Sequence, residues 1–303
     1  MNELSFPCMG TTVRLIADAP LEPVRDGIEA LAARLTRFDP ASELCALNAD
    51  PRPVVPASRL LRQAVAAALL GARRTGGLAD PTLLDAIEAA GYVHSRTGAE
   101  PASLEAALSA APPRRPATPG ARWRAIEVGE TTISRPPGLK IDLGGSAKGL
   151  AADWAASRLA GRFAVDCGGD VRVGGVHDVV LRGTARTLRV VDGAVATSGI
   201  DRHVWRREDG SFAHHLLDPG TGEPAWTGLI SATALAPTAL EAEALAKAAL
   251  LSGPRGARRV VAASGDIVIH DDGRSESVGP TGAIRLEAGR VVRAAPIPLR
   301  VAA

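Results

Sequence analysis

A helix expected at residues 238–252 carries two charges among apolar side chains. The capping box of Thr238 and Glu241 starts this helix, and a Gly-Pro pair ends it. At about 100° per residue, Glu243 and Lys247 project from its leucine-bearing side. The two could pair with each other, four residues apart. Such a pair does not explain why charges stand on an apolar face, where unpaired charge is costly, whereas a bound ion or pyrophosphate would.

A glycine turn supplies a second candidate site. The segment I-D-L-G-G-S-A-K-G at 141–149 runs from an apolar strand through Gly144 and Gly145 directly into a helix. Free N–H groups at a helix start, with the helix dipole behind them, form an anion site, and Lys148 adds a positive charge one turn in. The spacing matches neither a dinucleotide-binding GxGxxG motif nor a P-loop. A tight turn that requires glycine for positive φ explains the same residues without a ligand.

A second glycine pair follows in V-D-C-G-G-D-V-R-V-G-G at 165–175. Gly168 and Gly169 would let the backbone approach a bulky ligand closely, while Asp166 and Asp170 could hold hydroxyl groups. A hairpin with acidic turn residues accounts for the pattern equally well. The segment is therefore a candidate binding loop with a structural alternative.

Hydroxyl and imidazole groups come next along the chain. Thr197 and Ser198 end a strand in A-T-S-G, and His214 and His215 open H-H-L-L-D-P-G-T-G-E-P at 214–224. Histidine is the side chain whose ordinary pKa suits proton transfer near neutral pH. A lone histidine is more often a satisfied polar residue, but a pair beside an acidic turn favours a functional role.

The elements that must position these groups follow from apolar spacing. Helices are expected at 21–37, 58–75 and 146–160, with a first helical turn at Pro81 behind Asp80. A short helix and then a Pro- and Ala-rich surface connection are expected near 95–121. Strands are expected around Val13, Leu15 and Ala17 and at 122–128, 131–135, 139–143, 163–166, 170–175, 186–191, 194–197, 260–263, 267–270, 283–286 and 290–293. Mixed strands with segregated helices predict an α+β fold.

Composition excludes several classes of protein. Of the 303 residues, 46% are apolar and 22% are charged, which is typical of a globular chain. A net charge of +2 and an aromatic content of 3% disfavour a nucleic-acid groove. No apolar run is long enough to span a membrane. The three cysteines (Cys8, Cys45 and Cys167) lack metal spacing, so we expect reduced thiols and a cytoplasmic protein.

Taken in order, these segments resemble the FAD:protein FMN transferase family, the ApbE-like flavin transferases. The resemblance spans nearly the whole chain. Besides the segments at 141–149, 196–199 and 214–224, it includes C-M-G-T-T at 8–12, F-D-P-A-S-E-L-C-A-L-N at 38–48, T-G-G-L-A-D-P-T at 75–82, D-C-G-G-D-V at 166–171 and A-E-A-L-A-K-A at 242–248. Each motif is weak alone, and their common order carries the signal.

The resemblance implies a single α+β domain over residues 1–303, a two-lobed fold of mixed sheet and helices with FAD in the cleft between the lobes. It implies a transferase in which a Ser or Thr hydroxyl of an acceptor protein attacks the FMN phosphate of FAD and releases AMP. Such phosphoryl transfer needs alignment and charge neutralisation more than covalent help. Two alternatives remain open. One is a protein that binds FAD without transferring FMN, and the other is an FAD pyrophosphatase that gives FMN and AMP.

The resemblance also implies roles for individual residues. His215, directly before L-L-D-P, is the catalytic candidate, together with Lys148 near the phosphates. Met9 and the segment at 38–48 are expected to hold the flavin nucleotide. The other expected FAD contacts are Asp80, Asp142, Gly144, Gly145, Gly168, Gly169, Thr197, Ser198 and Lys247.

One departure from the family concerns Mg²⁺. Family members usually have Ala-Asp-Ala-x-Ala-Thr in the last helix, where the Asp and Thr side chains bind the metal together with a backbone carbonyl, here near Gly145. This chain has Glu243 for the Asp and Lys247 for the Thr. Glutamate is a competent ligand, but a charged lysine cannot coordinate Mg²⁺ and would repel it. Our hypothesis is that the Lys247 ammonium partly replaces the metal. If Lys247 turns away, Mg²⁺ chemistry could survive with fewer protein ligands.

Overall fold

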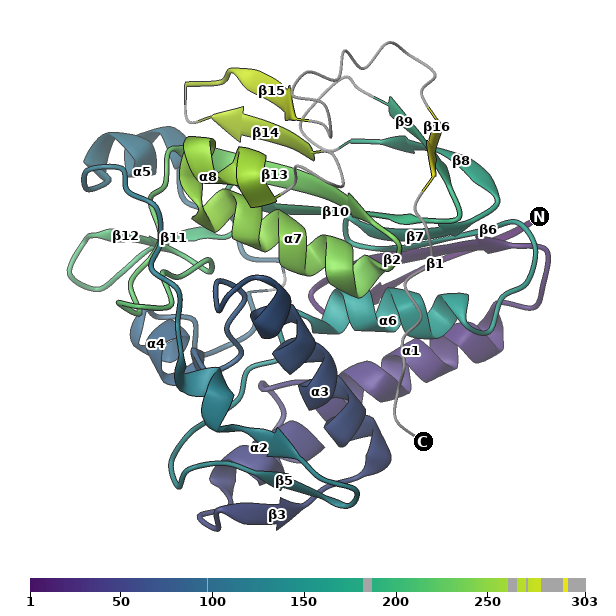
Figure 1. Cartoon of the computed structure of the whole chain (residues 1–303), viewed down its shortest axis with the longest axis horizontal. Coiled ribbons are helices and arrows are strands. Elements are labelled where there is room, and N and C mark those ends of the chain that lie inside the picture. The colour runs from purple at the N-terminus through teal and green to yellow at the C-terminus, as the bar shows by residue number, and fades with distance from the viewer. Residues whose placement is uncertain (97, 182–186, 261–265, 271, 279–290, 294–303) are drawn as a thin grey trace.

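The fold is built on an eight-stranded sheet with helices on one face (Figure 1). The structure is a computed structural model, and it describes residues 1–96, 98–181, 187–260, 266–270, 272–278 and 291–293. Within these residues, no helix combines the length and the apolar character that crossing a lipid bilayer requires. The mixture of helices and largely antiparallel strands confirms the expected α+β fold.

All neighbouring strands of the large sheet run antiparallel. In spatial order they are β1 (Asn2–Cys8), β2 (Thr11–Ala17), β6 (Phe163–Cys167), β7 (Asp170–Gly174), β10 (Ala194–Gly199), β13 (Leu229–Ala236), β14 (Asp266–His270) and β15 (Ser275–Val278). The expected alternation holds in β2, where Val13, Leu15 and Ala17 are buried between more exposed neighbours. Strands from both halves of the chain therefore meet in one sheet.

Four helices form a layer on one face of this sheet (Figure 1). They are α1 (Glu22–Leu35), α3 (Arg59–Arg74), α6 (Ala147–Ala156) and α7 (Ala239–Leu251). The helices α6 and α7 pack directly on the strands, α1 packs on α6 and also contacts β1, and α3 packs on α7 and α6. Ser58 caps α3 and Thr238 caps α7, each accepting a backbone N–H three residues on. The four long helices expected from the sequence are thus confirmed.

The opposite face of the sheet carries a smaller sheet of β8 (Val176–Val180), β9 (Thr187–Val191) and β16 (Val291–Arg293). Val195 and Leu235 of the large sheet pack against Leu188 and Val190 there. Successive strand residues point to opposite faces, so one sheet serves both layers. The remaining elements are α2 (Glu43–Ala49), α4 (Leu84–Ala89), α5 (Leu104–Ala110), α8 (Gly253–Val260), the 3₁₀ helix η1 (Arg122–Ala125), β3 (Val54–Pro56), β4 (Glu127–Val128), β5 (Thr132–Ser134), β11 (Val204–Arg206) and β12 (Phe212–His214).

Some expected strands differ from the structure. Residues 122–125 form η1, so only the short β4 remains of the strand expected at 122–128. The strand expected at 139–143 is wrong, because the Asn48 side chain pairs with both the N–H and the carbonyl of Ile141 at 2.8 Å, in place of a neighbouring strand. Val260 ends α8, and residues 261–263 and 283–286 lie outside the described part of the chain.

The helical turn expected at Pro81 is also displaced. Asp80 accepts the Thr82 N–H at 2.8 Å and the Thr82 hydroxyl at 2.6 Å, which forms a turn instead of a helix start. The helix α4 begins three residues later, at Leu84. Asp80 is therefore a turn residue and does not precede a helix start.

Candidate functional site

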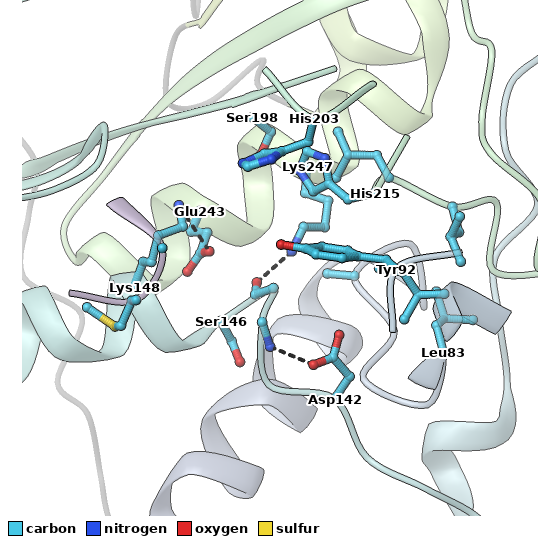
Figure 2. A pocket seen from close by; sticks show the side chains of 18 of the residues that line it. Leu83, Tyr92, Asp142, Ser146, Lys148, Ser198, His203, His215, Glu243 and Lys247 are labelled. Atoms are coloured by element: carbon cyan, nitrogen blue, oxygen red, sulfur yellow. Dashed lines mark hydrogen bonds and ion pairs between the residues drawn. The ribbon is translucent and has the colours of Figure 1, made fainter. Parts of the chain in front are cut away.

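A cavity of about 500 Å³ lies between α7, the start of α6 and the loop that follows β12 (Figure 2). Its volume is typical of small-molecule sites. The structure brings nearly all the expected site residues to this cavity: Met9, Asp80, Asp142, Gly144, Gly145, Lys148, Gly168, Thr197, Ser198, His215, Glu243 and Lys247. Gly169 is not among the lining residues; its N–H donates to Asp166 Oδ1 at 2.7 Å in the adjoining turn.

The glycine turn at 144–145 is fixed through Asp142. The Asp142 N–H donates to the Pro81 carbonyl at 2.8 Å, and Asp142 Oδ1 accepts the Gly144 N–H at 3.0 Å. Helix α6 begins directly afterwards at Ala147, so its first turn borders the cavity. A helix start in this position favours an anionic ligand.

The turn between β1 and β2 and the end of β10 also line the cavity. Met9 and Gly10 form the turn of the β1–β2 hairpin with positive φ values of 51° and 73°. This left-handed conformation is unusual for methionine, and it holds Met9 at the cavity. The Thr197 hydroxyl bonds with the Thr233 hydroxyl at 2.8 Å inside the sheet, while Ser198 beside it also lines the cavity.

Lys148 forms an ion pair at one side of the cavity. Its Nζ contacts Asp170, which is 1% exposed, and lies 3.8 Å from Glu243 Oε1. Burial opposes the charge on Lys148, but the two carboxylates outweigh burial and raise the pKa of the ammonium. Burial also raises the pKa of Asp170, against the attraction of Lys148. Lys148 is therefore charged at neutral pH.

Glu243 links the two helices that meet at the cavity. Its side chain is buried, and Oε2 accepts the Gly149 N–H of α6 at 3.0 Å. Glycine is required at 149, because a Cβ there would collide with the backbone of Ala239 and Leu240 in α7. The buried carboxylate thus has partners on α6, as a charge on an apolar face requires.

Lys247 reaches the glycine turn from the other side. Its Nζ donates to the Gly145 carbonyl at 2.6 Å (Figure 2). Burial lowers the pKa of Lys247, and Glu243 provides the strongest opposing attraction. The sequence left open a direct pair between Glu243 and Lys247. The hydrogen bonds of both side chains go instead to the backbone around the start of α6.

These contacts do not fit a divalent metal. The Gly145 carbonyl, which was the expected backbone ligand, accepts the Lys247 ammonium, so a cationic group already stands at that oxygen. Glu243, the expected side-chain ligand, holds a backbone N–H. Across the described ranges, no group of three or more His, Cys, Asp or Glu side chains is arranged to hold a metal ion.

The two adjacent histidines have different surroundings. His214 is 0% exposed, its Nδ1 accepts the Leu216 N–H at 3.3 Å, and burial lowers its pKa to about 3. His215 lines the cavity, with its ring edge-on to His203 at a centroid distance of 4.9 Å. Burial lowers the pKa of His215 well below its usual value. Both imidazoles are therefore neutral at pH 7, but only His215 faces the site.

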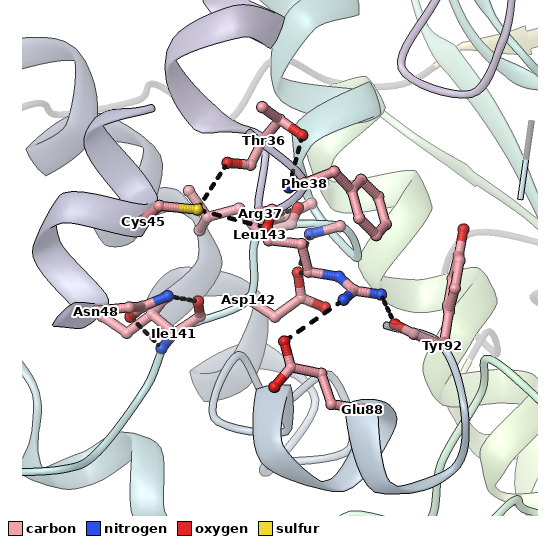
Figure 3. Close-up of polar contacts among 12 residues, drawn as sticks. Thr36, Arg37, Phe38, Cys45, Asn48, Glu88, Tyr92, Ile141, Asp142 and Leu143 are labelled. Carbon is pink, nitrogen blue, oxygen red and sulfur yellow. Dashed lines mark hydrogen bonds and ion pairs between the residues drawn. The ribbon is translucent and has the colours of Figure 1, made fainter. Parts of the chain in front are cut away.

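An aromatic and cationic group also lines the cavity (Figure 3). Phe38 comes from the segment at 38–48 that was expected at the site, whereas sequence reasoning did not single out Arg37 or Tyr92. Arg37 Nη2 donates to the Tyr92 carbonyl at 2.6 Å, and the guanidinium lies 4.2 Å and 4.7 Å from the ring centroids of Phe38 and Tyr92. Arg37 Nε is 3.8 Å from Asp142 Oδ1, which connects this group to the glycine turn. Tyr92 is the only tyrosine in the chain, but no local motif joins it to residues 37–38.

The fold and the site together define an α+β protein with a cationic cavity at a helix start, suited to a phosphate-bearing ligand. The sequence model of the ApbE family matches residues 9–269, and the chain belongs to this family. The ApbE protein of Thermotoga maritima, known from a crystal structure, matches with a TM-score of 0.72 and 26% identity, over 91% of this chain and 96% of that one.

Two curated relatives carry the name FAD:protein FMN transferase. The protein of Treponema pallidum (strain Nichols) is 31% identical over 243 residues, which is 70% of this chain and 65% of that protein. The protein of Escherichia coli (strain K12) is 31% identical over 146 residues, which is 43% of this chain and 41% of that protein. The matched segments therefore span less than two thirds of the length of these relatives.

Proposed function

We propose that this chain transfers FMN from FAD to a Ser or Thr hydroxyl of an acceptor protein and releases AMP. One observation carries the proposal: two ammonium groups, Lys148 and Lys247, meet at the start of α6 in the same cavity as the neutral imidazole of His215. The printed names of the curated relatives support it, since both are FAD:protein FMN transferases.

The cationic side of the cavity would bind the FAD pyrophosphate. Phosphoryl transfer depends on alignment and on neutralising the charge that spreads over the phosphate oxygens. The ammonium groups of Lys148 and Lys247, beside the positive dipole end of α6, are the groups that would neutralise it. The acceptor oxygen forms a bond to the phosphorus of the FMN phosphate as the bond from that phosphorus to the bridging oxygen breaks. AMP leaves with the bridging oxygen.

His215 would take the proton of the acceptor hydroxyl. Because burial lowers the pKa of His215, its imidazole is uncharged at pH 7 and has a nitrogen lone pair for that proton. His215 Nδ1 is buried and has no hydrogen-bond partner in the described part of the chain. The edge-on ring of His203 restricts how the His215 ring can turn. A hydroxyl placed beside this imidazole would therefore be activated for attack.

The finer assignments belong to the same proposal. The FAD contacts would be Met9, Asp80, Asp142, Gly144, Gly145, Gly168, Thr197 and Ser198, with Gly169 acting through the turn that it shapes. Strands from both halves of the chain share one sheet, which supports a single domain over residues 1–303. The free thiols of Cys8, Cys45 and Cys167 support a cytoplasmic location. The family resemblance implies Mg²⁺, but the Lys247 ammonium at the Gly145 carbonyl does not fit a metal ion there.

Product analysis tests the proposal against its alternatives. Purified protein and FAD are incubated with a gel-filtered extract of the organism that encodes the chain, which supplies the acceptor protein. Covalent flavin is detected by in-gel fluorescence and by mass spectrometry of the fluorescent band. An FMN mass on a Ser or Thr residue, with release of AMP, is the expected result. Free FMN together with AMP would indicate a pyrophosphatase. Bound but unchanged FAD would indicate a binding protein without transfer activity.

A further inference from the structure

The chain uses lysine selectively. Of its 35 lysine and arginine residues, only Lys140, Lys148 and Lys247 are lysines, and two of these three line the cavity. Arginine carries a broad planar guanidinium, whereas lysine carries a compact ammonium on a flexible four-carbon stem. A chain that otherwise relies on arginine therefore has lysine at the two positions where a small cation faces the proposed ligand.

Lys247 holds its cation against a backbone carbonyl. The ammonium donates to the Gly145 oxygen at 2.6 Å, and a Cβ at residue 145 would collide with that ammonium. An ammonium has three protons, so two remain after the bond to Gly145. Because Gly145 stands just before α6, the Lys247 ammonium lies near the N-terminal end of that helix, whose dipole favours an anion.

The charges around Lys247 are those that would otherwise attract a metal ion. Glu243, Asp170 and Asp142 attract the ammonium, and Lys148 repels it. Glu243 Oε2 holds the Gly149 N–H at 3.0 Å, and its Oε1 lies 3.8 Å from Lys148 Nζ. The carboxylate and the carbonyl that the family resemblance assigns to Mg²⁺ are thus both engaged by groups of this chain.

We propose that the Lys247 ammonium stands in for a divalent cation at the FAD pyrophosphate, so that this chain binds FAD without a metal. The inference rests on the proposed function and names the cation that serves it. One N–H of the ammonium stays hydrogen-bonded to the Gly145 carbonyl, and the other two donate to pyrophosphate oxygens. Hydrogen bonds between charged groups are about twice as strong as neutral ones. A divalent ion at the same carbonyl would meet the ammonium at contact distance and be repelled.

Calorimetry of FAD binding tests this inference on the full chain. The protein, stripped of metal, is titrated with FAD in EDTA and again in Mg²⁺. We expect the two dissociation constants to agree within about twofold. Lys247→Met keeps the length of the side chain and loses the charge, so binding should weaken about 10- to 100-fold in both buffers. Lys247→Thr should bind weakly in EDTA and recover in Mg²⁺, because its hydroxyl would join Glu243 Oε1 and the Gly145 carbonyl, which the substitution releases, as oxygen ligands.

Three results would overturn the inference: FAD binding by the unaltered protein that requires Mg²⁺, tight binding by Lys247→Met in EDTA, or an equal response of the Met and Thr variants to Mg²⁺. The first of these leaves the proposed function standing, since FAD still binds. If the unaltered protein binds no FAD in either buffer, the proposed function fails and the inference with it. The comparison of buffers needs no variant, so a variant that fails to fold does not weaken the test.

Discussion

Replacing His214 with asparagine should remove a defined part of the pH dependence of stability. His214 is 0% exposed, accepts the Leu216 N–H at 3.3 Å, and packs edge-on against Trp226 at a centroid distance of 4.6 Å. Burial lowers its pKa to about 3. Asparagine offers an oxygen in place of Nδ1 for the Leu216 N–H, but it does not titrate.

The size of the effect follows from proton linkage. In the unfolded chain a histidine titrates near pH 6.5. Below that pH the unfolded chain binds a proton that folded His214 does not bind, so stability falls as the pH falls, by about 1.36 kcal/mol per pH unit. From the plateau above pH 7 down to pH 5 this loss reaches about 2 kcal/mol. The folded pKa of about 3 lies below this window, so the slope persists throughout it.

Urea unfolding between pH 5 and pH 8 measures this contribution. The free energy of unfolding of His214→Asn is subtracted from that of the unaltered protein at each pH, which cancels the other titrating groups. The difference should be constant above pH 7 and should shift by about 2 kcal/mol in favour of the variant by pH 5. FAD binding should be unaffected, because His214 does not line the cavity. If the free energies of unfolding of the two proteins changed in parallel with pH, His214 would not be a buried, neutral imidazole.

Three further outcomes are expected. His215→Ala should abolish FMN transfer, seen by mass spectrometry of the acceptor, while FAD binding by calorimetry stays within about twofold, because the imidazole serves the acceptor hydroxyl; loss of binding instead would make His215 an FAD contact. Gly145→Ala should weaken FAD binding about tenfold in the same calorimetry, since the added Cβ would take the place of the Lys247 ammonium; unchanged affinity would contradict this. Asp170→Asn should lower the melting temperature by about 4 °C, which corresponds to a loss of about 2 kcal/mol in the free energy of unfolding. The reason is that Lys148 then has only the more distant carboxylate of Glu243 as an ionic partner. An unchanged melting temperature would show that this ion pair adds nothing to stability.

Local patterns predicted those elements whose burial follows a single period. Apolar residues at helical spacing predicted α1, whose Val24, Ile28, Leu31 and Leu35 are all buried. The same approach missed β1, because this edge strand buries only Phe6 and so shows no alternation. Apolar alternation alone therefore does not find a strand whose two faces are both largely exposed.

The segment at 139–143 shows the opposite error. Leu139, Ile141 and Leu143 are buried in alternation, as the sequence suggested. A strand also requires a neighbouring strand, and here the partner is the side chain of Asn48, more than ninety positions earlier. Alternation reports burial of side chains, whereas backbone pairing depends on distant parts of the chain.

The same distinction applies to the site. Two local irregularities in the sequence drew attention to the site. One is the glycine pair between a strand and a helix, with Lys148 one turn further on, and the other is the charge of Lys247 on an apolar helix face. Arg37 and Tyr92 show no such irregularity, and they meet only because the chain folds back between residues 37 and 92. The cavity therefore contains both motif residues and residues that only the tertiary fold brings to it.

Helix α7 joins the packing of the core to the chemistry of the site. Its many alanines let it lie closely against β10 and β13, and on its other side it approaches α6 at Gly149, where even a methyl group would not fit. This close approach lets the Glu243 carboxylate reach the Gly149 N–H and the Lys247 ammonium reach the Gly145 carbonyl. Larger side chains between the helices would hold both groups away from the turn. These small core residues thus set the distance between the charges of α7 and the N-terminal end of α6.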